Sequence, residues 1–168
     1  MKYMETGRFD QHPLMRLTLG LTLLFLLGFW ISNFGLYFSK MGLSPDSVIR
    51  YYRGSEEMFI PPRSALSLIE TTHTHLPMMG ILILFLTHLV IFAPFANNLK
   101  IGIILTAFLS ALSSETASWL VRFVHPNFAY LKIASFLIFQ SVLGFLLVVL
   151  ALFLWEARRR AHTQGLDW

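Results

Sequence analysis

The stretch "LKIASFLIFQSVLGFLLVVLALFLW", Leu131–Trp155, decides the fold class of this chain. Its only charged residue is Lys132, next to its first residue. An α-helix needs about 20 mostly apolar residues to cross the hydrocarbon core of a bilayer. The stretch is long enough and apolar enough, so it predicts a transmembrane helix.

Three further stretches of this kind precede it and predict three more spans. They lie at about 17–38, 72–92 and 101–121, and the helix of the second begins upstream, at about residue 64. The last two connections are short and contain Pro94 and Pro126, so neighbouring spans run antiparallel. The chain is therefore predicted to be all-α, an integral membrane four-helix bundle forming a single transmembrane domain over residues 1–168.

The composition supports a membrane protein and excludes several other classes. Of the 168 residues, 55% are hydrophobic and 13% are charged, against roughly a quarter charged in soluble domains. The chain has no cysteine, which excludes a disulfide framework, a thiolate zinc site, an iron–sulfur cluster and covalent c-type haem. Its 13 basic residues are scattered at span ends with no basic stripe, so we expect no nucleic-acid partner.

The long connection at 39–63 has a helix signature of its own. Ser44 suits an N-cap, Pro45 suits the first helical position, and Gly54 suits the end of the helix. We expect a short surface helix here, lying on the bilayer or packed over the bundle. A lid, or a docking surface for a partner, is the sharper alternative.

The placement of basic residues predicts the orientation. The two sides of the membrane carry seven and six Lys and Arg residues, which gives no bias by number. However, Arg16 directly precedes the first span and "EARRR" directly follows the fourth, and basic residues at span ends favour the cytoplasm. We therefore expect both termini in the cytoplasm, and the first span to be a retained anchor.

Polar residues inside the spans gather at one depth. Counted at about 1.5 Å per residue, Asn33, His75, Glu115 and Gln140 fall in one layer in the outer half of the membrane. A carboxylate in this layer needs a cation or a hydrogen-bond donor. The histidines of the second span are the candidate partners of Glu115, and Arg122 on its own helix is the rival.

The second span carries most of the candidate site residues. At 100° per residue, Glu70, His73 and His88 share one face, whereas His75 points about 140° away from Glu70 and His88. Two histidines on different helices can hold b-type haem, and His73 or His75 with His125 would form such a pair. His88 is a further candidate ligand, although no second histidine lies at its depth within the spans.

The same segment offers ligands for a single metal ion. The Glu-x-x-His spacing of Glu70 and His73 points both side chains at one metal in carboxylate-bridged bundles, and Glu115 would complete the set. Proton handling, contact with a quinone, and no cofactor at all are the remaining alternatives for this polar group.

Two segments carry a resemblance to known proteins. "PPRSALSLIETTHTHLPMMGILILFLTHLVIF", Pro61–Phe92, and "WLVRFVHPNFAYLKIAS", Trp119–Ser135, resemble a group of small bacterial inner-membrane proteins with four spans and a Thr-His-x-His motif. The resemblance implies a multi-pass protein of the bacterial cytoplasmic membrane. A looser likeness is to four-helix membrane cytochrome b subunits.

Together these features predict a small redox or accessory subunit of a respiratory-type complex. Its partners would be the lipid bilayer, other membrane subunits and a quinone. We find no nucleophile–base arrangement and no phosphate-binding loop, so we do not expect an enzyme acting alone. The alternatives are a structural or assembly subunit whose polar residues only specify helix packing, and a carrier of metal ions or protons.

Overall fold

The computed structural model describes residues 13–163, and five helices make up most of that part of the chain. In chain order they are α2 Pro13–Lys40, α3 Pro45–Arg53, α4 Ala65–Ile91, α5 Asn97–Phe123 and α6 Phe128–Thr163.

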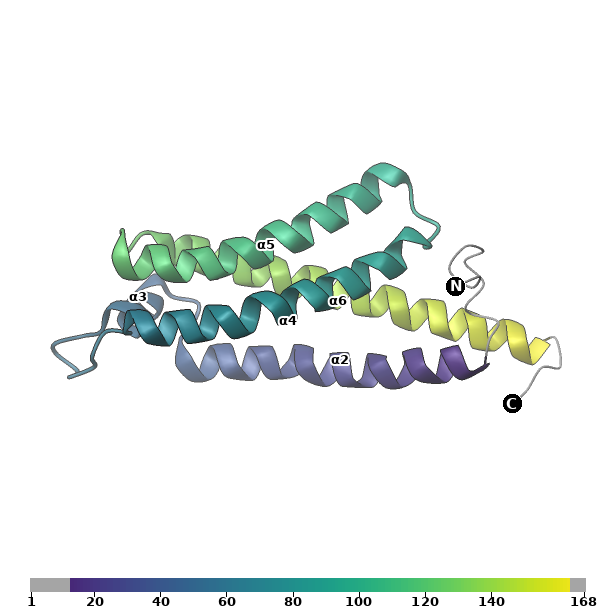
Figure 1. Ribbon diagram of the computed structural model, residues 1–168, viewed down its shortest axis with the longest axis horizontal. Coiled ribbons are helices and arrows are strands. Elements are labelled where there is room, and N and C mark those ends of the chain that lie inside the picture. Colours follow the sequence, from purple (N-terminus) through teal and green to yellow (C-terminus); the bar gives the residue numbers. More distant parts are fainter. Residues whose placement is uncertain (1–12, 164–168) are drawn as a thin grey trace.

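Four of these helices are long and apolar enough to cross a membrane: α2, α4, α5 and α6 (Figure 1). This confirms the prediction of an all-α membrane bundle. The helices are longer than the predicted spans. A helix of 27 residues reaches about 40 Å, whereas the hydrocarbon core is about 30 Å thick. The extra turns reach the polar zones at both ends of the bundle.

The packing of the four long helices is uneven. The most extensive contact is between α5 and α6. Helix α2 packs mainly on α6 and α4 mainly on α5, whereas α2 and α4 hardly touch within the described residues. Aromatic rings join α2 to α6. Tyr37 stacks on Phe136, and Trp30 lies against Gly144, where even a Cβ atom would come within 3.0 Å of the indole.

Helix α3 covers one end of the bundle. The hydroxyl of Ser44 caps it as the sequence predicts, and the helix packs on α5 and α6 with Val48 and Tyr52 buried. Of the two expected placements, the structure therefore shows the helix packed over the bundle. We call the part of the bundle near α3 the α3 half, and the part where α2 begins the opposite half.

After α3 the chain turns tightly back on itself over residues 55–60, a segment that we call the strap. Ser55 and Ile60 pair in an antiparallel bridge. Gly54 enters this strap with φ of 80°, and a Cβ atom there would collide with the carbonyl oxygen of Ile60. Glycine is therefore the residue that this turn requires.

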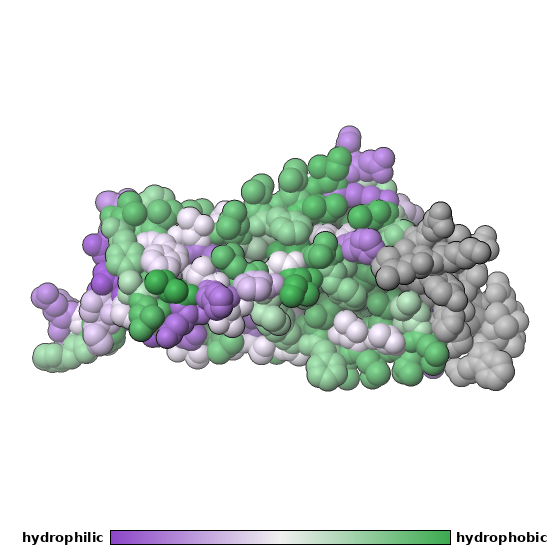
Figure 2. Space-filling view, viewed as in Figure 1, coloured by the Kyte–Doolittle hydropathy of each residue, from purple (hydrophilic) through white to green (hydrophobic). Residues whose placement is uncertain are grey.

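Each half of the bundle has an apolar cluster of its own. In the α3 half it contains Val48, Leu68, Val121 and Phe136. In the opposite half it contains Ile83, Leu86, Leu143 and Leu146. Figure 2 shows that hydrophobic residues also cover much of the visible exterior, with hydrophilic residues at the α3 end, on the face near that end and at the turn between α4 and α5, as expected of a bundle whose sides face lipid.

Candidate functional site

A cavity of about 290 Å³ lies in the α3 half, and every described helix contributes to its wall. Its polar lining includes four residues predicted from depth to share a layer. These are Asn33 from α2, His75 from α4, Glu115 from α5 and Gln140 from α6. The structure therefore brings the four side chains to one space, which a purely apolar bundle would not contain.

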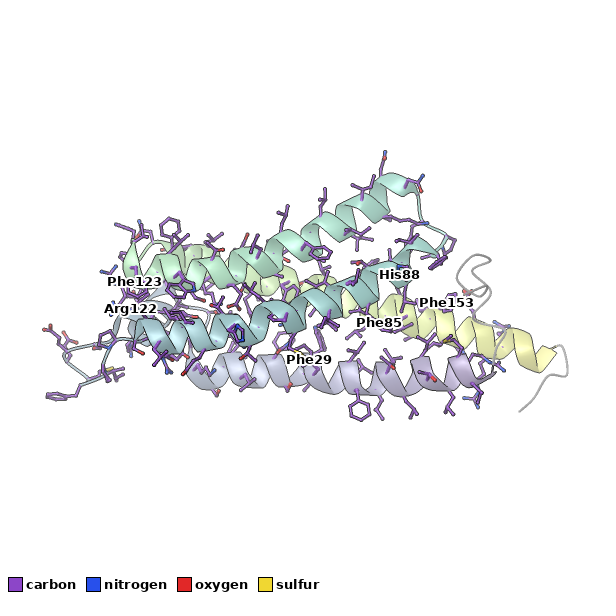
Figure 3. All side chains as sticks on the ribbon, in the orientation of Figure 1. Phe29, Phe85, His88, Arg122, Phe123 and Phe153 are labelled. Carbon is purple, nitrogen blue, oxygen red and sulfur yellow. The ribbon has the colours of Figure 1, made fainter. Side chains whose placement is uncertain are left out.

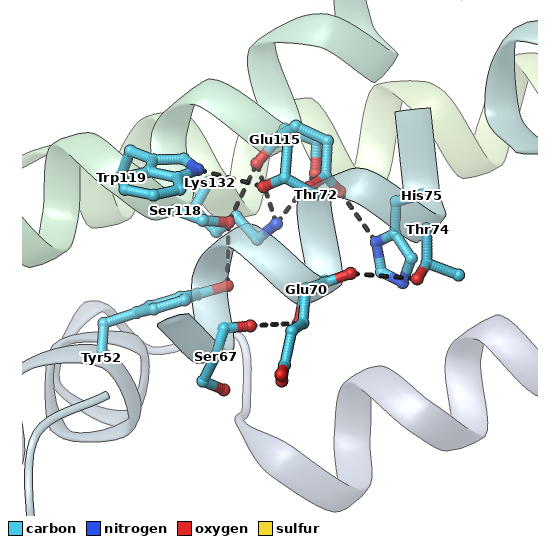
Figure 4. A network of polar contacts seen from close by, with 12 residues as sticks. Tyr52, Ser67, Glu70, Thr72, Thr74, His75, Glu115, Ser118, Trp119 and Lys132 are labelled. Atoms are coloured by element: carbon cyan, nitrogen blue, oxygen red, sulfur yellow. Dashed lines mark hydrogen bonds and ion pairs between the residues drawn. The ribbon is translucent and has the colours of Figure 1, made fainter. Parts of the chain in front are cut away.

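His75 and Glu115 form the central contact of this cavity. The Nδ1 atom of His75 lies 3.0 Å from Oε1 of Glu115 (Figure 4). The carboxylate is 8% exposed, while the imidazole is 51% exposed. A buried carboxylate is costly without a hydrogen-bond donor, so His75 supplies the donor from the mouth of the cavity while Glu115 stays inside.

Lys132 adds a buried cation to the same cavity. Its Nζ atom donates to the carbonyl oxygen of Ser114 at 2.9 Å and to the hydroxyl of Ser114 at 3.1 Å. Its charge also interacts with that of Glu115. Lys132 was counted from the sequence only as one of the basic residues on one side of the membrane and was given no place in the site, whereas its side chain is buried between α5 and α6.

A signal for this burial was present in the sequence. Lys132, Phe136, Phe139, Gln140 and Leu143 follow one another at intervals of four, three, one and three residues, which places them on one stripe of a helix. All five are buried. A lysine on the same stripe as Gln140 therefore points into the bundle.

Two further hydrogen bonds frame the cavity. The hydroxyl of Tyr52 on α3 lies 2.9 Å from the hydroxyl of Ser118 on α5. The indole N–H of Trp119 donates to the hydroxyl of Thr72 at 3.0 Å. Burial raises the pKa of Tyr52 to about 12. The hydrogen bond with Ser118 lowers this pKa, and the nearby charge of Glu115 raises it further. Tyr52 is therefore a neutral phenol at physiological pH.

Gln140 presents an unsatisfied polar group in the cavity wall. Its side chain is buried, and its Oε1 atom has no hydrogen-bond partner in the described structure. The indole N–H of Trp30 donates to the backbone oxygen of Gln140 instead, at 2.9 Å. Because a buried amide oxygen without a donor is unfavourable, this atom favours a ligand or water molecule that carries an O–H or N–H group.

The cavity opens sideways between α2 and α4. Its wall includes Phe29 and Leu36 of α2 and Met78 of α4, all of which are exposed on the bundle exterior. These two helices hardly touch, so the cavity is continuous with the lipid-facing surface. A molecule dissolved in the bilayer can reach His75 without crossing the polar end of the protein.

The face of α4 that was expected to carry a cofactor points away from the bundle. Glu70 and His73 are exposed, as are Ile81 and Leu84 on the same face. The reason is that α4 packs on its neighbours through the side that carries Ile83. The spacing of residues along a helix predicts which side chains share a face, but it does not predict whether that face points into the bundle or away from it.

His125 and His88 lie apart from the cavity. His125 is exposed beyond the end of α5, where its Nδ1 atom accepts a hydrogen bond from the backbone of Asn127. His88 lies in the opposite half (Figure 3), edge-on to Phe92, with its Nε2 atom buried and without a hydrogen-bond partner in the described structure. Neither side chain lines the cavity among its described residues.

The predicted metal ligands are also not gathered. Within residues 13–163 no three His, Asp or Glu side chains lie close enough together to hold a metal ion. Glu70 and His73 face outward while Glu115 faces the cavity. The rival partner of Glu115, Arg122, instead donates from Nε to the backbone oxygen of Arg63 at 2.7 Å.

The model of a family described as a transmembrane helical domain matches residues 42–161. The match begins after α2 and includes the cavity residues His75, Glu115, Lys132 and Gln140. No curated protein and no solved structure matches the chain.

Proposed function

Because the chain belongs to the Aq_1264_TM family of transmembrane helical domains, we propose that it acts within the bilayer as a redox or accessory subunit that binds a quinol. The observation that carries the proposal is the hydrogen bond between His75 and Glu115 in the wall of a cavity that opens toward lipid. Such a site suits a molecule with an apolar tail and a polar, hydrogen-bonding head.

The polar groups of the cavity suit a quinol head in particular. Imidazole is the side chain that exchanges a proton most readily near neutral pH, and a quinol must lose its hydroxyl protons when it is oxidised. His75 and Glu115 together form an acceptor for such a proton, with the carboxylate stabilising the imidazolium that results. In this proposal the side chain of Gln140, whose Oε1 atom is buried and unpartnered in the described structure, turns toward the cavity and accepts a hydrogen bond from the second hydroxyl.

In this proposal, partner subunits supply the remaining proton and electron acceptors of the reaction. Oxidation of a quinol releases two protons and two electrons. This chain supplies the binding space and the acceptor of the first proton, and a neighbouring membrane subunit supplies the acceptor of the second proton and the redox centre that receives both electrons. The proposed setting is the bacterial cytoplasmic membrane with both chain termini in the cytoplasm.

The rival proposals use the same residues differently. As a structural subunit, the chain would use the His75–Glu115 contact only to fix α4 against α5. As a cytochrome b-like protein, it would hold haem b between His73 or His75 of α4 and His125, after rearrangement. As a metal or proton carrier, it would gather Glu70, His73 and Glu115 around one ion.

The test is saturable binding of decylubiquinol to the purified protein in lipid nanodiscs. Trp30 and Trp119 both bond to residues of the cavity wall, so the fluorescence of the two tryptophans reports occupancy. We expect His75→Ala and Glu115→Gln each to weaken binding by about tenfold, the loss expected from one charge-assisted hydrogen bond.

The chain offers a matched control on the same helix. His73→Ala and Glu70→Gln alter the outward face of α4 and should leave the affinity unchanged. Equal weakening by both pairs of variants, or no saturable binding, would leave helix packing as the better account. An absorption band near the haem Soret region that is lost in His75→Ala would replace quinol with haem b.

A further inference from the structure

A second, larger pocket of about 610 Å³ lies at the α3 end of the bundle. It is bounded by the last residue of α2, by α3, by the segment after the strap and by the first turn of α4. It has four lining residues in common with the His75 cavity, namely Lys40, Tyr51, Arg63 and Ser67. The two spaces are therefore adjacent and share a wall.

The charge of this pocket is uniformly positive. Three cationic side chains line it, Lys40, Arg50 and Arg63, and no Asp or Glu occurs among the described residues of its wall. The remaining polar lining consists of hydroxyl groups from Ser47, Tyr51, Ser64 and Ser67. Ammonium, guanidinium and hydroxyl donors around one space are the groups that bind phosphate in proteins.

Arg63 is held in place before any ligand binds. Its guanidinium lies 4.3 Å from the centre of the Tyr51 ring. Its backbone N–H donates to the carbonyl oxygen of Tyr52 at 3.0 Å, and its own carbonyl oxygen accepts the bond from Arg122. A cation fixed in this way loses little conformational entropy on binding an anion.

The other two cations retain donors for a ligand. Arg50 donates one N–H to the sulfur of Met58 at 3.2 Å, which is a weak acceptor, and a guanidinium has five N–H donors in all. Lys40 is exposed at the end of α2, so its ammonium group can turn into the pocket.

We propose that this pocket binds a phosphate group. It lies where α2 ends and α4 begins, at the ends of spans, which is the level of the lipid headgroups. The phosphate can come from an anionic phospholipid, whose acyl chains would follow the groove between α2 and α4, or from a soluble phosphate. The phosphate would be held without His75, but the two sites are adjacent, and a phospholipid whose acyl chains follow this groove would lie across the opening of the His75 cavity.

The experiment uses the full chain in detergent and separates the two sources. In one arm, phosphatidylglycerol is compared with a diacylglycerol that has the same acyl chains and no phosphate. In the other arm, inorganic phosphate is compared with chloride at equal ionic strength. Thermal shifts give occupancy, because a ligand that binds the folded state raises the melting temperature.

The variants Arg63→Gln and the double replacement Lys40→Gln with Arg50→Gln should each weaken phosphate binding by at least about tenfold. Arg53→Gln is the control, since Arg53 is exposed on α3 and does not line the pocket. If Arg63→Gln fails to fold, the double variant decides the question.

Stabilisation by phosphatidylglycerol alone identifies a lipid headgroup as the source, and saturable stabilisation by inorganic phosphate identifies a soluble one. Either result supports the site when the double variant abolishes it. The proposal is overturned if neither source binds, if diacylglycerol binds equally well, or if the double variant and Arg53→Gln behave alike.

Discussion

The α3 half and the opposite half of the bundle each enclose a cavity, but the two cavities have different walls. The cavity in the α3 half is lined by charged and hydrogen-bonding residues such as His75, Glu115 and Lys132. The cavity in the opposite half, about 210 Å³, is lined almost entirely by apolar residues such as Leu86, Phe95 and Leu150. The first therefore offers several groups that orient a polar ligand, while the second, whose wall includes Glu156 among otherwise apolar residues, suits a lipid chain.

The helices are also joined differently in the two halves. In the α3 half, polar contacts cross between helices, including Tyr52 with Ser118 and Thr72 with Trp119. In the opposite half, buried aliphatic side chains fill the interface. Lipid offers no hydrophobic drive for helix association, so tight packing has to hold the apolar half. In the α3 half, hydrogen bonds between helices add to the contacts of its own apolar cluster and surround the polar cavity.

The largest expected effect comes from breaking the apolar half. Leu143→Ala removes a side chain that is 1% exposed in the cluster with Ile83 and Leu86. A cavity of this kind costs about 2–5 kcal/mol, and thermal unfolding in detergent measures the loss. The matched control is Leu137→Ala on the same helix, where the leucine is 41% exposed and faces outward. Equal losses at both positions would show that this cluster does not hold the half together.

A smaller effect is expected from alkaline pH acting on the α3 half. Burial raises the pKa of Tyr52 from 10.0 to about 12, so the unfolded chain releases this proton at lower pH than the folded chain. The stability that Tyr52 contributes is therefore complete below pH 10 and is lost as the pH rises to about 12. The loss should reach about 2 kcal/mol.

The difference between the wild type and Tyr52→Phe isolates this titration from that of other groups. We expect the wild-type melting temperature to fall more steeply between pH 10 and 12 than that of the variant. Parallel curves would mean that Tyr52 ionises as it does in water, and hence that α3 is not seated on the bundle as described.

The architecture could be predicted from the sequence because it depends on long apolar runs. Runs such as Leu131–Trp155 have no stable alternative to a membrane helix. The helix at 45–53 was predictable for a local reason, since Ser44 and Pro45 specify its first turn regardless of the rest of the fold.

The candidate site was only partly predictable, since depth follows from residue counting and direction does not. Asn33, His75, Glu115 and Gln140 were placed in one layer by counting, and all four line one cavity. Whether Glu70 or His75 faces inward depends on how α4 rotates against α5. That rotation depends on how apolar residues of both helices pack together. The sequence pattern of α4 alone carries no information about this packing.

The smallest expected effect tests a single polar link of the α3 half. Thr72→Val keeps the shape of the side chain but removes the acceptor for the indole N–H of Trp119. We expect a loss of about 0.5–1.5 kcal/mol in unfolding free energy. Thr71→Val is the control, because the hydroxyl of Thr71 bonds only to the backbone of its own helix, at Ser67. If the two variants lose the same stability, hydrogen bonds between helices add nothing beyond those within a helix, and the contrast between the two halves would rest on packing alone.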